Sequence, residues 1–291
     1  RIIKESVFKT GNVAFLVSSD SLQVLSRSPV MLDVLHGIED SLAGCGMSML
    51  QGVINAGRQL PPIVARGGVD GVIIWPNLEG VHDEVIETMR KFKIVYVMTA
   101  IEERLPGDRI QNNNRQIGRM AAKYLHSKGH QKVGYITPSA LDLQRNMCNR
   151  WLAFSNYTGE VGIEAIQVII EQSKTDLLEM DSEKEDRVFQ EIRNIFQSEQ
   201  RLTGVFVTCD SLTAKLYPIL RSIGIEPGKD LEIVSCNHEV PLLAGLDPKP
   251  VTIDIQAEKI GRKAVEQLRW RITHPEDESQ MTIEIEPKLL I

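Results

Sequence analysis

Short apolar runs alternate with amphipathic stretches along almost the whole sequence, and this alternation limits the folds that the chain can adopt. A continuous apolar run of about four to eight residues is typical of a strand that is buried on both faces. The runs of this kind in the first half are residues 12–18, 48–54, 71–75 and 94–98. Those in the second half are residues 133–137, 166–171, 204–209 and 231–236.

Segments with helical periodicity fill the gaps between these strands. The expected helices are residues 29–42, 60–66 and 81–92 in the first half, and 145–157, 183–196 and 211–223 in the second. A strand, helix, strand order with parallel strands requires right-handed crossovers, which place helices on both faces of a sheet. The sequence therefore predicts an α/β fold with two doubly wound parallel-sheet subdomains.

The segment Asp108–Thr137 joins the two halves. It contains a strand end, a polar elbow, an amphipathic helix, a Gly-His turn and a second buried strand. Asn112, Asn113 and Asn114 precede the helix, and an Asn side chain is a good N-cap because its amide oxygen accepts hydrogen bonds from free backbone N–H groups. Near the end of the chain, residues 251–255, 258–272 and 282–286 predict a further strand, helix and strand. These late elements must join one or both sheets, so we expect the chain to cross between the subdomains more than once.

Composition and charge exclude several classes of protein. The net charge of −6 gives no electrostatic footprint for nucleic acid on this chain. No apolar run approaches the roughly 18–20 residues of a membrane span, and the start of the chain lacks the apolar core of a signal peptide. The four cysteines have no metal-ligand spacing, and free thiols are expected. Free thiols are typical of a cytoplasmic protein, and we expect that location. No catalytic motif, metal site or cofactor site is found, so we do not expect an enzyme.

Polar residues gather at the carboxyl ends of the expected strands, where ligands bind in open α/β sheets. These ends are residues 18–28, 76–78 and 99 in the first half, and residues 138–142, 208–211 and 237–239 in the second. Their amide and hydroxyl groups suit a polar small molecule that is recognised by hydrogen bonds.

Three residues near these edges have alternative interpretations. Arg150 lies in an apolar helix pattern and would hold an anionic or bidentate partner, unless its side chain extends to solvent. Asp210 is either a site residue or the N-cap of its helix. His238 either lines a cleft or is simply exposed to solvent.

Several segments together resemble the effector-binding core of the LacI/GalR family of bacterial transcription regulators, which is similar to periplasmic sugar-binding proteins. The most specific of them is NNNRQIGRMAAKYLHSKGHQKVGYIT, residues 112–137. The others, in the family's order, are SPVMLDVLHGIEDSL, VDGVIIWP, RWLAF, TGVFVTCDSLTAKLY, IEPGKDLEIVSCNH and IDIQAEKIGRKAVEQL.

The resemblance implies two subdomains of periplasmic binding protein type I, joined by three crossovers, with the effector in a cleft that closes by a hinge motion. The N-terminal subdomain would comprise residues 1–111 and 255–286, and the C-terminal subdomain residues 112–254 and 287–291. By position in the family's motifs, eight residues are candidates for ligand binding. They are Asn113, Arg150, Asn237, Asp210, Asn146, Met31, Cys209 and Gln256. With Asn113 assigned to the ligand, we expect Asn112 or Asn114 to be the N-cap of the helix.

Two departures from the family pattern bear on the charge of the ligand. Asn113 and Asn237 stand where the family has Asp, while Arg150 is retained. A neutral amide is a weaker acceptor than a carboxylate, so two strong acceptors for sugar hydroxyls are lost and a cation remains. We therefore expect an anionic ligand, such as a sugar acid or a sugar phosphate, in place of a neutral sugar.

The resemblance also implies partners. We expect a homodimer formed through the helices that begin near Pro29 and Glu258, and operator DNA bound by an N-terminal headpiece that is absent from this sequence. The expected function is that of a repressor core that senses a small effector. The alternative is an extracytoplasmic solute-binding protein of a sugar transporter, which has the same fold.

Overall fold

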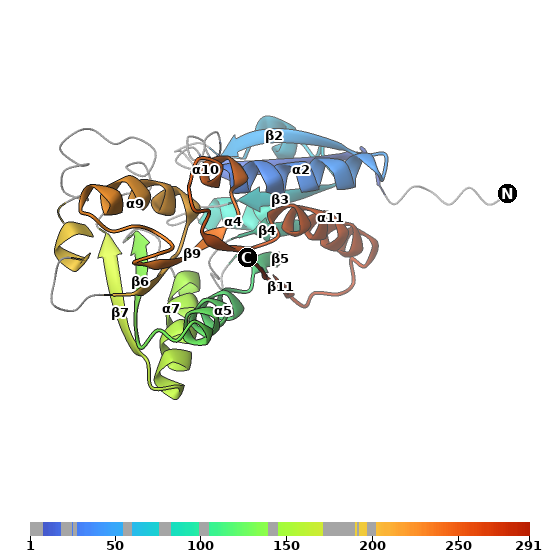
Figure 1. The fold of residues 1–291 in the computed structure, drawn as a ribbon. Coiled ribbons are helices and arrows are strands. Elements are labelled where there is room, and N and C mark those ends of the chain that lie inside the picture. Colours follow the sequence, from blue (N-terminus) through green and yellow to red (C-terminus); the bar gives the residue numbers. More distant parts are fainter. Residues whose placement is uncertain are drawn as a thin grey trace. The chain divides into compact units, whose positions relative to one another are not determined.

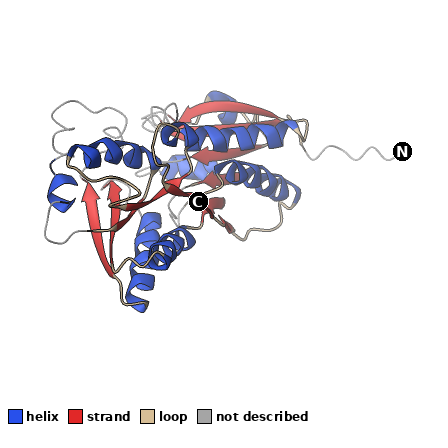
Figure 2. Ribbon diagram, viewed as in Figure 1, coloured by secondary structure: helices blue, strands red, loops and turns tan. Residues whose placement is uncertain are grey.

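The structure is a computed structural model, shown in Figures 1 and 2. It describes residues 8–18, 25, 28–54, 60–75, 83–98, 105–138, 145–170, 190, 192–196 and 202–291. The chain divides into two compact units. Unit 1 comprises Arg1–Asn112 and Ala257–Ile285, and unit 2 comprises Asn113–Gln256 and Glu286–Ile291. The chain therefore passes from one unit to the other three times.

Unit 1 is a parallel sheet with the strand order β11-β5-β4-β3-β1-β2. The sheet is doubly wound, because the order runs outward from β1 in both directions. Its strands are β1 (Asn12–Ser18), β2 (Ser48–Ile54), β3 (Gly71–Trp75), β4 (Ile94–Val97), β5 (Asp108–Asn112) and β11 (Thr282–Ile285). Its helices in the described ranges are α2 (Pro29–Ala43), α3 (Pro62–Ala65), α4 (Asp83–Met89) and α11 (Ala257–Thr273).

Unit 2 repeats this plan with the strand order β12-β10-β9-β8-β6-β7. All neighbouring strands are parallel except β12, which is antiparallel to β10. The strands are β6 (Lys132–Pro138), β7 (Glu164–Ile170), β8 (Gly204–Val207), β9 (Glu232–Asn237), β10 (Val251–Asp254) and β12 (Lys288–Leu290). The described helices with assigned labels are α5 (Asn114–Ser127), α7 (Arg145–Glu160), α9 (Asp210–Ser222) and α10 (Val240–Leu243).

The expected fold class is confirmed, and β1, β2 and β3 have the bounds that the sequence predicts. Two strands differ. Asp108 begins the whole buried strand β5 rather than a strand end, and β12 was not expected. Of the long helix expected at 183–196, residues 190 and 192–196 are helical and the rest lies outside the described residues. No helix in the described ranges is both long and apolar enough to span a membrane.

Each unit contains a pair of helices that touch through their backbones at a glycine. In unit 1, α2 and α11 lie side by side (Figure 1), and a Cβ added at Gly261 would lie 2.1 Å from the carbonyl oxygen of Val34. In unit 2, α5 and α7 lie side by side, and a Cβ added at Gly118 would lie 2.0 Å from the carbonyl oxygen of Arg150. Only glycine allows so close an approach.

The sequences around these two glycines are alike, which relates the two units. Ile117, Gly118 and Arg119 in α5 repeat as Ile260, Gly261 and Arg262 in α11. The backbone partners also correspond, because each glycine faces the carbonyl of one residue and the N–H of the residue four positions later. On this correspondence Arg150 of unit 2 takes the place that Val34 has in unit 1.

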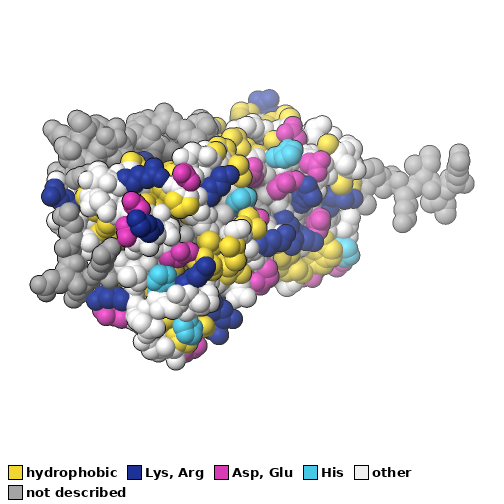
Figure 3. Space-filling view, viewed as in Figure 1, with side chains coloured by type: hydrophobic (Ala, Val, Ile, Leu, Met, Phe, Trp, Pro, Cys, Tyr) yellow, Lys and Arg dark blue, Asp and Glu magenta, His cyan; other side chains and the backbone are white. Residues whose placement is uncertain are grey.

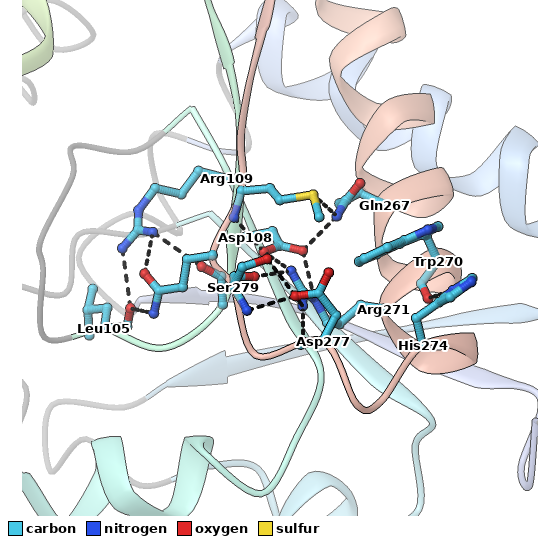
Figure 4. A network of polar contacts seen from close by, with 12 residues as sticks. Leu105, Asp108, Arg109, Gln267, Trp270, Arg271, His274, Asp277 and Ser279 are labelled. Atoms are coloured by element: carbon cyan, nitrogen blue, oxygen red, sulfur yellow. Dashed lines mark hydrogen bonds and ion pairs between the residues drawn. The ribbon is translucent and has the colours of Figure 1, made fainter.

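A buried ion pair ties α11 to the sheet of unit 1 (Figure 4). Asp108, at the start of β5, is fully buried, and Arg271 of α11 is 7% exposed. The Nε and Nη2 atoms of Arg271 donate to the Asp108 carboxylate at 2.9 and 2.5 Å. Gln267 Nε2 and the Met281 N–H also donate to this carboxylate, at 2.7 and 2.9 Å. One carboxylate thus connects β5, α11 and the segment that leads into β11.

Candidate functional site

A buried arginine lies at the carboxyl ends of two strands of unit 2. Arg150, in α7, is 3% exposed, so its side chain does not extend to solvent. Its Nε and Nη2 atoms donate to Asn114 Oδ1 at 3.0 and 2.8 Å, and its Nη1 donates to the Thr208 carbonyl at 2.9 Å. A longer contact of 3.6 Å joins Nη1 to Cys236 Sγ. The guanidinium is therefore held in one orientation by α5, the end of β8 and the end of β9.

Asp210 is a second buried charged residue at the same edge, and it links the start of α9 to β9 and β10. It is the first residue of α9, and the N-cap is Cys209, so the alternative that Asp210 caps the helix is wrong. Its carboxylate accepts hydrogen bonds from Ser235 Oγ and, at 2.6 Å, from the Glu239 N–H, with a weak contact of 3.5 Å to Thr252 Oγ1. Burial raises the pKa of the Asp210 carboxyl to about 7, although these hydrogen bonds oppose the shift. Asp210 is therefore partly protonated near neutral pH.

The backbone is strained immediately after β9. Asn237 has a φ of 106° and His238 a φ of 61°, a region that side chains other than glycine rarely adopt. Asn237 Nδ2 donates to Glu239 Oε2 at 3.3 Å. The Nδ1 atom of His238 is buried and has no hydrogen-bond partner among the described residues. Strained residues and unpaired buried polar atoms cluster at functional sites, so the end of β9 has the features of a ligand site.

Asn113 is the N-cap of α5, and this corrects an expectation. Its Oδ1 accepts a hydrogen bond from the Gln116 N–H at 3.0 Å, and its Nδ2 donates to Glu286 Oε1 at 3.0 Å. The sequence predicted Asn112 or Asn114 as the cap, with Asn113 turned toward ligand. The helix begins at Asn114, so only residue 113 has the N-cap position, and Asn114 is buried against Arg150. A ligand contact by Asn113 stays a prediction.

The remaining candidates are distributed over both units. Cys209 lies beside Asp210 and is 7% exposed, and burial raises the pKa of its thiol to about 11. Gln256 has a φ of 57°, and its Nε2 donates to the Glu286 carbonyl. Met31 is 1% exposed and belongs to α2 of unit 1. Asn146 lies in α7, and its side chain is outside the described residues.

The structure thus brings Arg150, Asp210 and Asn237 to one edge of the unit 2 sheet. Sequence reasoning missed Asn114 and Ser235 as members of this site. Ser235 gives a usable signal, because it is a polar residue inside the apolar run of β9. Asn114 gives none, because its partner Arg150 is 36 residues away in the sequence. In the described part of the chain no group of His, Cys, Asp and Glu could hold a metal ion.

Comparison with known proteins assigns the family. The profile described as "Periplasmic binding protein-like domain" matches residues 122–291, more than half of the chain. The chain belongs to this family. Its relatives include the HTH-type transcriptional repressor PurR of Edwardsiella ictaluri, which is 26% identical over 281 residues, covering 92% of this chain and 77% of that protein. The ribose operon repressor of Haemophilus influenzae is 28% identical over 188 residues, covering 64% of this chain and 53% of that protein.

Solved structures with the same fold include two transcriptional regulators. A complex of the transcriptional regulator CelR with cellobiose has a TM-score of 0.75 and 18% identity, covering 97% of this chain and 84% of that one. A LacI family transcriptional regulator from Enterococcus faecium with bound ribose has a TM-score of 0.74 and 20% identity, covering 96% of this chain and 97% of that one. The resemblance to the LacI/GalR effector-binding core is thereby confirmed.

Proposed function

We propose that this chain is the effector-binding core of a LacI-type transcription regulator, and that unit 2 contributes the end of β9 and the groups around Arg150 and Asp210 to the effector site. The observation that carries the proposal is the gathering of buried polar groups at one sheet edge of a family member. A hydrophobic core does not need a buried arginine and a buried aspartate, because desolvating charges costs free energy. The relatives named above are repressors, which favours a regulator over a transport protein.

The charge at this edge supports an anionic effector. All groups that accept hydrogen bonds from Arg150 in the described structure are neutral: an amide oxygen, a carbonyl oxygen and a thiol. Of the two carboxyl groups at this edge, Asp210 has its pKa raised to about 7 by burial, and Glu239 already accepts a hydrogen bond from Asn237 Nδ2. A carboxylate or phosphate on the ligand would complete the electrostatics of the site. The ligand class that we propose is therefore a sugar acid or a sugar phosphate.

A thermal-shift screen tests this proposal. A ligand that binds the native state raises the melting temperature by mass action. We expect sugar acids or sugar phosphates to raise it more than their neutral parent sugars at equal concentration. Stabilisation by the neutral sugars alone would contradict the anionic assignment, and no response to any sugar derivative would contradict the proposed effector class.

Substitution of Arg150 then tests whether the guanidinium of this residue recognises the anionic group of the ligand. In Arg150→Met the affinity for the anionic ligand should fall by at least about tenfold, because a hydrogen bond to a charged group contributes about 1.5–3 kcal/mol. Arg150→Lys should retain part of the affinity. Arg221→Met is the matched control, because Arg221 lies on the exposed side of α9. Titration calorimetry measures all three, and unchanged affinity in Arg150→Met would contradict the role of this residue.

We further propose that the regulator is a homodimer through the exposed face of α2. Leu32 of this helix is 52% exposed, so its apolar side chain lies at the surface of the helix that the family resemblance places in the dimer interface. Leu32→Glu should weaken the dimer by at least about tenfold, because a charge would be buried without a partner. Analytical ultracentrifugation measures the dissociation constant. Leu152→Glu is the control, since Leu152 is 51% exposed on α7 of unit 2; an equal effect of both substitutions would argue against α2.

A further inference from the structure

A groove on the outside of unit 2 lies between helix α5 and the C-terminal strand β12. Its volume is about 470 Å³, which is within the range of pockets that hold small molecules. One stripe of α5 and the last residues of the chain line it: Gln116, Arg119, Met120, Lys123, Tyr124, Ser127, Lys128, Leu289 and Ile291. None of these residues belongs to the effector site around Arg150 and Asp210.

The charged side chains that line this groove are all cationic. They are Arg119, Lys123 and Lys128, in a chain whose net charge is −6. Arg119 is partly compensated by Glu160 of α7, at 3.8 Å. Lys123 and Lys128 have no acidic partner among the described residues, and Lys128 Nζ lies 5.3 Å from the centre of the Tyr124 ring. The two lysines are therefore available to bind an anion.

The rest of the groove is apolar. Met120 and Leu289 are half-buried, and Ile291 is 93% exposed. Tyr124 contributes its ring, because its hydroxyl already donates to Glu232 Oε1 at 2.6 Å. Figure 3 shows hydrophobic side chains together with Lys and Arg side chains around the C-terminal end of the chain. A ligand here would bury an apolar body and meet positive charge at its polar end.

We propose that this groove is a second small-molecule site, which takes an amphiphilic anion: a carboxylate, sulfonate or phosphate carried on an apolar body. Charge complementarity favours an anion, since both lysines lack an acidic partner in the described structure. The apolar lining favours a ligand with an apolar body, since a small inorganic anion would leave Met120, Leu289 and Ile291 in contact with water. The volume favours a small molecule over a folded partner, because a stable protein interface needs about 800 Å² from each side.

Titration with three matched probes tests the proposal. Octanoate has both the apolar body and the charge, octanol has only the body, and acetate has only the charge. We expect octanoate to bind with a dissociation constant below about 1 mM, and the other two to bind at least about tenfold more weakly. Equal binding of octanol and octanoate would overturn the role of the lysines, and no binding of octanoate would overturn the site.

Substitutions of groove residues test whether octanoate binds in the groove. In Lys123→Glu/Lys128→Glu the octanoate affinity should fall by at least about tenfold, and Met120→Ser should lower it independently of charge. Lys249→Glu is the matched control, because Lys249 is exposed in unit 2 and lies outside the groove. Far-ultraviolet circular dichroism and the melting temperature establish that each variant is folded.

Two results would overturn the proposal even if octanoate binds. One is retention of full affinity in Lys123→Glu/Lys128→Glu. The other is tighter binding of an acidic peptide such as hexaglutamate at the same residues, which would make the groove a peptide-docking surface. Nuclear magnetic resonance shifts of the amides of residues 119–128 distinguish this groove from the site around Arg150, whose partner on α5 is Asn114 at the start of that helix.

Discussion

Replacing Arg271 by methionine should lower the free energy of unfolding by about 3–5 kcal/mol, because it leaves the buried Asp108 carboxylate without its cation. Asp108 is fully buried, and the Arg271 side chain is the only cation that the described structure places against it. Methionine keeps most of the length of the arginine side chain, so the loss of charge is separated from the loss of packing. Equilibrium unfolding in urea, followed by circular dichroism, measures the change.

The control for this substitution is an ion pair on the exposed side of the same helix. Arg262 pairs with Glu258, and its side chain is 50% exposed. Arg262→Met should change the free energy of unfolding by less than about 1 kcal/mol, because exposed pairs are screened by water. The double variant Asp108→Asn/Arg271→Met should recover part of the loss, because no unpaired charge is then buried. Similar effects of Arg271→Met and Arg262→Met would contradict the importance of burial.

Asp108 also shows which part of the fold can be predicted from sequence. The strands β1, β2 and β3 are continuous apolar runs, and a local pattern is enough to predict them. The strand β5 has the sequence DRIQN, yet all five of its residues are buried. Its polar side chains are satisfied by partners far away in the chain, such as Arg271, which is 163 residues from Asp108. A local pattern cannot reveal such a partner, so the sequence alone predicts only a strand end at the position of β5.

The same limit applies to the candidate site. The carboxyl ends of the strands could be located, because the parallel order follows from the alternation of strands and helices. The partners of Arg150 could not, because Asn114 and Thr208 reach it from 36 and 58 residues away. The correction at Asn113 has a different origin. A cap is a local motif, but which of three consecutive asparagines has that position depends on the residue at which the helix begins.

Replacing Gly118 by alanine should lower the free energy of unfolding by about 1–3 kcal/mol, although alanine is the better helix former. The new Cβ would lie 2.0 Å from the Arg150 carbonyl oxygen and 3.1 Å from the Phe154 nitrogen, so α5 and α7 must move apart. Gly159→Ala is the matched control within α7. A Cβ there has no neighbour within 4 Å, so alanine should raise the free energy of unfolding by about 0.5–1 kcal/mol.

The two substitutions should change the free energy of unfolding in opposite directions, so they separate the cost of close packing from the gain in helix propensity. The Gly118 variant also tests whether this packing affects ligand binding. The atom against which the added methyl group presses belongs to Arg150 itself, so a displaced α7 moves the guanidinium away from Asn114 and Thr208. We therefore expect Gly118→Ala to lower the affinity for the anionic effector as well, whereas Gly159→Ala should leave this affinity unchanged. Calorimetry under conditions where both variants are folded measures the two affinities. Stabilisation by Gly118→Ala, or an unchanged affinity in a clearly destabilised variant, would show that the helix contact does not position Arg150.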